Sequence, residues 1–391
     1  MQNTLRQLFI VVLACVIASC STPPTNRTTL GGAYAMPDKY AAQVVHDVLA
    51  NGGNAVDAAV AAGFSLAVTF PQAGNIGGGG FMLTHMNGKA NFLDYRETAP
   101  LAASRDMYLD QDGNVIKGAS LIGIRAAGVP GTVQGMWQAH QKFGTKPWAE
   151  LLAPAIQLAV NGFEVHPKLA ASIPDSLEWF GSKTNFASHF AGLEKGGVFK
   201  QPELGKTLQR IAALGLNGFY KGKTADMLVK YVQNLGGIIT KEDLAKYEAK
   251  WRDPITFTYK GNKIISMSPP SSGGICIAQI LKSVEPYNIN QYEHNSLKYI
   301  QLITEAERRT YADRSEFLGD PDFVHVPIDT LISPYYLSQR MSDFNWDKAT
   351  KSSDITYGEI TLLESDETTH YSIIDQFGNA VAVTTTINGA Y

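Results

Sequence analysis

The sequence has few of the side chains that build disulfide frameworks and metal centres. It contains 3 cysteines among 391 residues, with no Cys-x-x-Cys pair, so a framework of disulfides is excluded. Its 8 histidines are scattered, in neither His-x-His nor His-Glu-x-x-His spacing, and a zinc site therefore has no support. The sequence predicts no metal.

An excess of charge of one sign is also lacking. The 33 lysines and arginines nearly balance the 36 aspartates and glutamates, which leaves a formal net charge of −3. Such a chain has no basic field of the kind that binds nucleic acid. Apolar residues make up 45% and charged residues 18%, a globular balance that excludes a disordered or fibrous chain.

Glycine, in contrast, is abundant and clustered. Ten residues at 71–80 read Pro-Gln-Ala-Gly-Asn-Ile-Gly-Gly-Gly-Gly, without the Gly-x-Gly-x-x-Gly spacing or the Gly-Lys-Ser/Thr ending of nucleotide-binding loops. The simpler interpretation is that the backbone passes close to another element here. A Gly-x-Ser-x-Gly elbow is missing as well, and the sequence predicts no organic cofactor.

The first residues, 1–19, form a targeting signal. Arg6 precedes an apolar run at 8–18 that is too short to span a bilayer, and the run ends Ile-Ala-Ser before Cys20. This ending is similar to a bacterial lipobox, which predicts lipidation of Cys20, a polar tether at 20–27 and a place in the periplasm or cell envelope, anchored to a membrane. The alternative is an ordinary secretory signal with Cys20 incidental.

Hydrophobic periodicity predicts a mixture of helices and strands after the tether, in one continuous unit from residue 28 to 391. The run at 55–68 is small or apolar except for Asp57. We therefore expect a helix buried on all sides, in which Asp57 must find hydrogen-bond donors. Asn87-Gly88 predicts a hairpin turn between two strands. The remaining expected elements are helices at 38–50, 148–160, 204–214, 275–281 and 296–314, strands at 81–86 and 90–95, and two short strands within 255–266 that are joined by a turn at 260–262.

The last segment alternates polar and apolar residues at 369–374 and 380–387, with a turn between, and therefore predicts a second hairpin. Only four residues follow it. We expect this hairpin to have an unpaired edge and an uncovered face, a liability that indicates an incomplete chain or a missing layer supplied by another chain.

Thr368, at the entry to this hairpin, has a chemical interpretation besides its strand propensity. Threonine is a poor nucleophile unless a base is adjacent, and the α-amine of an N-terminal threonine can be that base. An internal threonine reaches this state after the preceding peptide bond is cut, for which its own hydroxyl can attack the carbonyl before it.

Several sequence pieces, in order, resemble the gamma-glutamyltranspeptidases, which are N-terminal-nucleophile hydrolases. The resemblance runs from about Thr29 to the last residue and is specific through the order and spacing of its pieces. These pieces are Asn51-Gly52-Gly53-Asn54-Ala55-Val56-Asp57-Ala58-Ala59, residues 71–82, Asp94-Tyr95-Arg96-Glu97-Thr98-Ala99-Pro100, Gly128-Val129-Pro130-Gly131-Thr132, Pro269-Pro270-Ser271-Ser272-Gly273-Gly274, Tyr311-Ala312-Asp313-Arg314, Thr368-Thr369-His370-Tyr371-Ser372 and Thr384-Thr385-Thr386-Ile387-Asn388.

The resemblance implies roles for five residues. Thr368 matches the nucleophile, and the bond between Glu367 and Thr368 matches the self-cleaved bond. Thr386 matches a catalytic threonine whose hydroxyl hydrogen-bonds the nucleophile. Asn388 matches a side chain at the α-end of the glutamyl group, and Arg96 matches the residue that binds the substrate α-carboxylate, for which a guanidinium is suited.

The resemblance also implies an α+β fold, a four-layer αββα sandwich that is incomplete at the C-terminus. Residues 28–367 would be the large-subunit part and 368–391 the start of the small subunit, the partner after self-cleavage. The implied activity is gamma-glutamyl transfer and hydrolysis, with glutathione or related compounds as donors and water, amino acids or peptides as acceptors. The Gly-Gly oxyanion pair, two serines and an acidic residue of the family's small subunit have no match in 391 residues, so we expect the chain alone to be inactive.

Two alternatives stay open at this level. One is a related N-terminal-nucleophile amidase that acts on another acyl group, as glutaryl or cephalosporin acylases do. The other is a non-catalytic surface lipoprotein that keeps the scaffold as a binding module.

Overall fold

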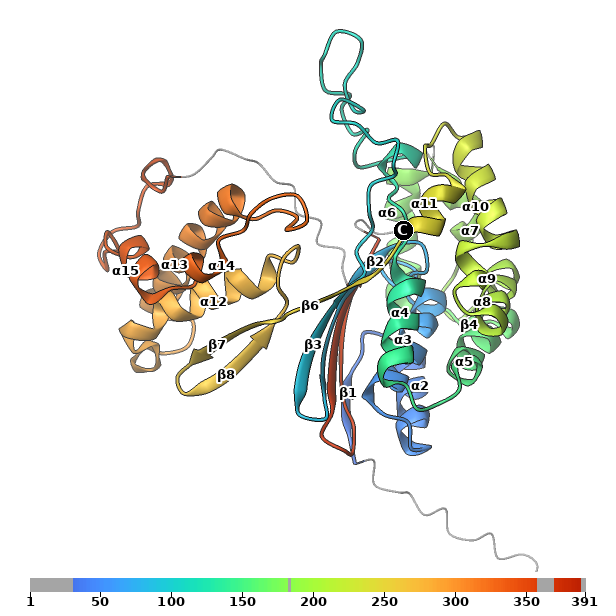
Figure 1. Cartoon of the computed structure of the whole chain (residues 1–391), viewed down its shortest axis with the longest axis horizontal. Coiled ribbons are helices and arrows are strands. Elements are labelled where there is room, and N and C mark those ends of the chain that lie inside the picture. Colours follow the sequence, from blue (N-terminus) through green and yellow to red (C-terminus); the bar gives the residue numbers. More distant parts are fainter. Residues whose placement is uncertain (1–30, 182–183, 357–368, 388–391) are drawn as a thin grey trace, which may run out of the picture.

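The computed structural model describes residues 31–181, 184–356 and 369–387, which form two lobes (Figure 1). The main lobe combines a sheet with helices, and a second lobe covers residues 253–356. The expected signal and tether, with Cys20, lie outside the described residues, as do Glu367, Thr368 and Asn388. Within the part that is described, no helix is both long enough and apolar enough to cross a membrane.

A six-stranded antiparallel sheet organises the main lobe, in the order β1-β9-β10-β2-β3-β6. The turn between β2 and β3 is formed by Asn87 (φ 52°) and Gly88 (φ 79°), the left-handed conformations that Asn-Gly predicts. The strands are β1 Ala33–Ala35, β2 Gly79–Met86, β3 Lys89–Asp94, β6 Lys250–Arg252, β9 Thr369–Ile374 and β10 Ala380–Thr386.

The β9–β10 hairpin forms as predicted, but the expectation of an unpaired edge is wrong. β1 pairs with β9 and β2 pairs with β10, so the hairpin is central in the sheet. Its partners lie near the beginning of the described chain, and a local pattern does not show such distant pairing. One face is buried through residues such as Tyr371 and Val383, whereas the other is partly exposed at His370 and Ile374.

Helices of the main lobe cover one side of the sheet (Figure 1). α3 packs against β9 and β10, and α4 packs against β2 and β3. The described sheet and these helices correspond to one sheet layer and one helical layer of the expected sandwich. The helices are α2 Lys39–Ala50, α3 Ala55–Thr69, α4 Thr132–Phe143, α5 Trp148–Asn161, α6 Pro167–Phe180, α7 Phe186–Phe190, α8 Pro202–Leu214, α9 Asn217–Tyr220, α10 Gly222–Asn234 and α11 Lys241–Lys246, with a small sheet of β4 Phe163–Glu164 and β5 Val198–Phe199.

Every residue of α3 is buried, as its composition predicts. The carboxylate of Asp57 accepts hydrogen bonds from the backbone N–H groups of Asn54 (3.0 Å) and Thr145 (2.9 Å), and from the Thr145 hydroxyl (2.5 Å). The expected donors are therefore present, and they tie α3 to the loop between α4 and α5.

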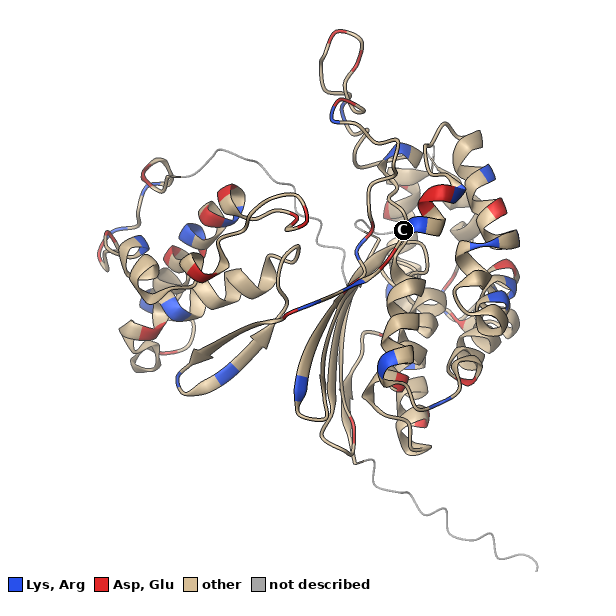
Figure 2. Ribbon diagram, viewed as in Figure 1, with Lys and Arg blue, Asp and Glu red and all other residues tan. Residues whose placement is uncertain are grey.

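The second lobe has apolar clusters of its own, for example Phe257 with Ile275 and Leu331, and Val284 with Leu302. The domain boundaries expected from the sequence stay a prediction. The sequence shows no linker because the junction is a strand, β6, which belongs to the main sheet. The elements of this lobe are β7 Ile255–Tyr259, β8 Asn262–Ser266, α12 Gly273–Val284, α13 Leu297–Phe317, α14 Ile328–Leu331 and α15 Pro334–Arg340. Figure 2 shows acidic and basic residues interspersed over both lobes.

Candidate active site

Three strands bring two of the predicted site residues to one end of the sheet. Thr386, the last residue of β10, is paired with Gly79 at the start of β2. The ladder between β2 and β3 continues past Asp94, because Gly80 and Tyr95 exchange backbone hydrogen bonds of 3.3 and 3.0 Å. Arg96 follows directly and therefore lies on the other side of Gly79 from Thr386.

Gly79 is the position where this convergence needs a glycine. A Cβ at this residue would lie 2.6 Å from the carbonyl oxygen of Tyr95 and 2.9 Å from the Cα of Arg96, distances that real side chains do not show. This close passage of backbone confirms the structural interpretation of the glycine-rich loop.

Asn75 holds this loop against the end of β10. Its amide Nδ2 donates to the carbonyl oxygen of Thr386 (3.0 Å) and to Oγ1 of Thr385 (3.2 Å). Its Oδ1 accepts from the backbone N–H of Gly78 (2.9 Å) and from the hydroxyl of Thr132 (2.6 Å). This buried residue was not predicted from the sequence, because an asparagine in a glycine-rich loop is more often a turn residue.

The main chain of Arg96 is fixed on both sides. Its N–H donates to Oδ1 of Asp94 (3.1 Å), and its carbonyl accepts from the hydroxyl of Tyr247 (2.8 Å). Its side chain stays 37% exposed, with Nε 3.2 Å from Oε2 of Glu97 and the guanidinium 5.8 Å from the ring centre of Phe81. The guanidinium is thus oriented and still open to a ligand.

Glu97 was not assigned a role from the sequence, although it directly follows Arg96. Burial raises the pKa of its carboxyl group above the ordinary value, and the charge of Arg96 opposes this shift. The only signal for it was its place next to the arginine.

A cavity of about 370 Å³ opens beside Arg96 and Glu97, a volume typical of small-molecule sites. Ile387, the residue after Thr386, lines the same cavity, so the end of β10 and Arg96 share one space. Tyr108 and Arg125 contribute to its wall from the segment that follows β3.

His370 lies at the partly exposed face of the sheet and was also not predicted. Its Nδ1 is 2.8 Å from Oγ1 of Thr384, and its Nε2 is 3.1 Å from Oγ of Ser372. Partial burial lowers the pKa of the imidazole. The ring therefore favours the neutral form, in which it links β9 to β10.

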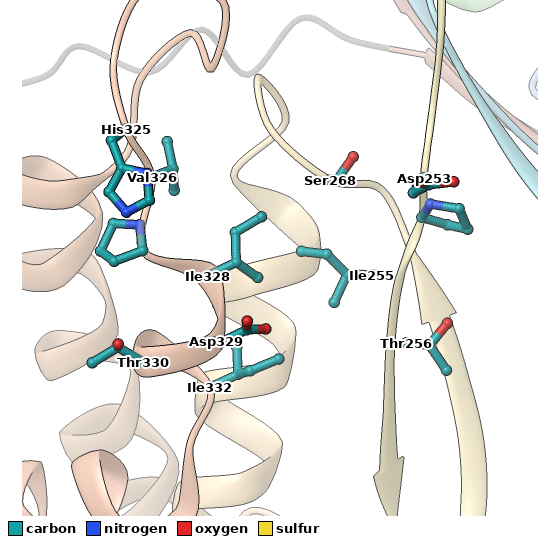
Figure 3. A pocket seen from close by; sticks show the side chains of 12 residues that line it. Asp253, Ile255, Thr256, Ser268, His325, Val326, Ile328, Asp329, Thr330 and Ile332 are labelled. Atoms are coloured by element: carbon teal, nitrogen blue, oxygen red, sulfur yellow. The ribbon is translucent and has the colours of Figure 1, made fainter.

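A second cavity, of about 530 Å³, lies in the second lobe and contains none of the predicted site residues. Figure 3 shows His325 and Asp329 opposite Asp253 and Ser268. The described residues contain no group of three or more histidines, cysteines, aspartates or glutamates able to hold a metal ion. Nothing in this cavity matches the nucleophile chemistry expected from the sequence.

Comparison with known proteins shows the family to which the chain belongs. A family model described as gamma-glutamyltranspeptidase matches residues 41–391. The chain belongs to the gamma-glutamyltranspeptidase family. Its fold agrees with that of the gamma-glutamyltranspeptidase from Pseudomonas nitroreducens complexed with L-DON: the TM-score is 0.80 at 49% identity, over 82% of this chain and 96% of that chain.

Curated relatives support the same family. The chain is 49% identical to a glutathione hydrolase proenzyme of Pseudomonas aeruginosa over 96% of its own length and 67% of the relative. It is 46% identical to that of Escherichia coli strain K12, over 92% of this chain and 63% of the relative. The chain thus spans about two thirds of the length of these relatives. An acylase proenzyme of a Pseudomonas strain is similar at the lower identity of 36%.

Family membership confirms the α+β, N-terminal-nucleophile fold expected from the sequence. Of the predicted site residues, the structure brings Arg96 and Thr386 together. The catalytic and binding roles of all the predicted site residues stay predictions, and Thr368, Glu367 and Asn388 lie outside the described part of the chain.

Proposed function

We propose that the full-length protein is a gamma-glutamyl transferase and hydrolase that cleaves itself between Glu367 and Thr368 and then uses Thr368 as its nucleophile. The observation that carries this proposal is the convergence of Thr386 and Arg96 at one end of the sheet, beside a cavity that both strand ends line. Thr386 and Arg96, the two described residues with proposed roles, are then close enough to act on one small substrate.

The reaction begins with the free α-amine of Thr368, which takes the proton of the threonine hydroxyl. The oxygen attacks the gamma-carbonyl carbon of the donor, the amide C–N bond breaks, and the leaving amine takes up the proton. Water, an amino acid or a peptide then attacks the resulting ester and releases the glutamyl group. Thr386 suits the supporting role because it follows Thr385, the register partner of Thr369.

The donor class follows from the charge beside the cavity. Arg96 offers a guanidinium to the α-carboxylate of a gamma-glutamyl group, and Asn388 supplies an amide at the same end. Glutathione and other gamma-glutamyl compounds carry this carboxylate. A glutaryl group carries a carboxylate at the same position and lacks only the α-amine, so the charge of Arg96 fits both donors. The closer similarity to glutathione hydrolase proenzymes than to the acylase favours the gamma-glutamyl donor.

The place of the protein is part of the proposal. The targeting signal and Cys20 support export and lipid anchoring in the periplasm or cell envelope. Cys20→Ser should release the protein from the membrane fraction and abolish incorporation of labelled fatty acid. Continued labelling of this variant would refute anchoring through Cys20.

The activity is tested with the full-length gene product and gamma-glutamyl-p-nitroanilide, with glutathione as a second donor. We expect two chains after self-cleavage and release of p-nitroaniline that rises when a dipeptide acceptor is added. An intact single chain without turnover would support the non-catalytic lipoprotein instead, and turnover of glutaryl but not gamma-glutamyl donors would support the amidase.

A further inference from the structure

A connected set of charged groups crosses the junction between the two lobes. β6, which joins the lobes, carries the basic residues seen there in Figure 2. From β6, Arg252 donates through Nη1 and Nη2 to Oδ1 and Oδ2 of Asp322, at 3.1 and 2.8 Å. Asp322 belongs to the second lobe, and Lys250 donates to the same carboxylate at 2.6 Å.

The third nitrogen of Arg252 faces the main lobe. Its Nε donates to Oδ2 of Asp94 at 2.8 Å, and Oδ1 of Asp94 accepts the N–H of Arg96 at 3.1 Å. Arg252 and Asp94 are only 16% and 8% exposed in their side chains, so solvent screens this pair less than a surface pair. Both carboxylate oxygens of Asp94 are therefore committed, one to each neighbour.

We propose that Asp322, Arg252 and Asp94 form a relay that positions Arg96 for the donor α-carboxylate, so that the second lobe contributes to substrate affinity. The inference rests on the proposed function, because it takes Arg96 as the carboxylate-binding residue. Arg252 and Asp322 are positioning residues in this account, since they act through Asp94 and the Arg96 backbone.

The geometry explains why an arginine stands at position 252. A guanidinium presents donors along two of its edges, so it can bind Asp94 and Asp322 at once. A lysine has one nitrogen on a flexible stem and cannot hold both carboxylates in this arrangement. The hydrogen bonds from Arg252 and Lys250 also hold the pKa of Asp322 well below its ordinary value, which keeps the relay charged at neutral pH.

The relay acts on the backbone from which the guanidinium extends. Tyr247 holds the carbonyl of Arg96 from within the main lobe, and Asp94 holds its N–H. Loss of the Asp322 end leaves Asp94 and Arg252 free to turn, which loosens one of these two anchors. A small displacement of a binding group is enough to weaken an oriented contact.

The test uses Asp322→Asn in the full-length protein, because Asp322 is partly exposed and its neutral isostere preserves the shape of the side chain. KM for gamma-glutamyl-p-nitroanilide should rise about fivefold, the lower end of typical coupling between sites, with kcat little changed. KM for 4-aminobutyryl-p-nitroanilide, which lacks the α-carboxylate, should not change. Glu203→Gln, which removes the carboxylate of an exposed pair with Lys206 on α8, is the matched control and should behave as wild type.

A double-mutant cycle separates positioning from general stability. In an Arg96→Gln background, Asp322→Asn should raise KM no further, because the group that the relay positions is gone. Arg252→Lys should reproduce the KM effect of Asp322→Asn. Equal KM increases for both donors, or an additive effect in the Arg96→Gln background, would overturn the relay.

The outcomes also distinguish this inference from the proposed function. A wild-type protein without gamma-glutamyl turnover would refute the function and, with it, the relay. A wild-type protein that turns over the donor, with Arg96→Gln raising KM and Asp322→Asn leaving it unchanged, would refute the relay alone.

Discussion

Replacing Arg96 with glutamine removes the guanidinium from the cavity beside β10 while keeping much of its length. The main-chain contacts to Asp94 and Tyr247 involve backbone atoms and should survive the change. Hydrogen bonds to charged groups contribute about 1.5–3 kcal/mol, and the 37% exposure of the Arg96 side chain places the loss near the middle of that range. A loss of about 2 kcal/mol corresponds to a KM about 30-fold higher for a donor with an α-carboxylate.

The assay compares two chromogenic donors, gamma-glutamyl-p-nitroanilide and 4-aminobutyryl-p-nitroanilide. The first should show the full increase in KM, and the second, without an α-carboxylate, should show almost none. Self-cleavage should continue in the variant. Arg105→Gln removes an arginine whose side chain is 96% exposed and serves as the matched control. An unchanged KM for the gamma-glutamyl donor would refute the role of Arg96 and leave it as the ion-pair partner of Glu97.

Three further predictions test the nucleophile, the glycine loop and the buried acid. Thr368→Ala in the full-length protein should leave a single inactive chain, and two bands on a denaturing gel would contradict the assignment. Gly79→Ala should lower the free energy of unfolding by about 1–3 kcal/mol. Gly77→Ala is the control and should leave it unchanged, because a Cβ there would meet no atom within 4 Å. Equal Tm values for the two variants would contradict this prediction. Burial raises the pKa of Glu97 above its ordinary value of 4.5, so the protonated carboxyl group favours the folded state. This contribution to stability is complete below pH 4.5 and is lost as the pH rises through the raised pKa. Relative to Glu97→Gln, the wild type should therefore gain Tm between about pH 8 and about pH 4, and a difference independent of pH would count against this effect.

Much of the local structure could be predicted from the sequence because it depends on neighbours along the chain. The largely apolar run of α3 and the Asn87-Gly88 turn required no information from distant residues. The β9–β10 hairpin was also predicted correctly. The pairing of its edges was not, because β1 and β2 lie hundreds of residues earlier and their patterns do not specify which strand they join.

The residues of the candidate site likewise include some that could be predicted from the sequence and others that could not. Arg96 and Thr386 were found through a family resemblance, whereas Asn75 and Tyr247 act through hydrogen bonds to backbone atoms. A backbone carbonyl has no sequence signature, so a residue that binds one cannot be recognised from composition or spacing. The strand β6 at the junction of the two lobes was not predicted either, because its three residues are too few for an alternating pattern.

These backbone contacts explain how a partly exposed arginine can bind a small carboxylate well. A free surface arginine loses side-chain entropy when it binds, and this loss offsets much of the charge interaction. In Arg96 the backbone is already fixed through its N–H and carbonyl groups, and Glu97 restrains the guanidinium at 3.2 Å. Binding of a donor then restricts rotation about fewer additional side-chain bonds, so a larger part of the charge interaction contributes to affinity. Under the proposed function, the affinity of the site would then depend on residues that never touch the substrate, and the proposed relay would place part of its specificity in the strands and in the junction with the second lobe.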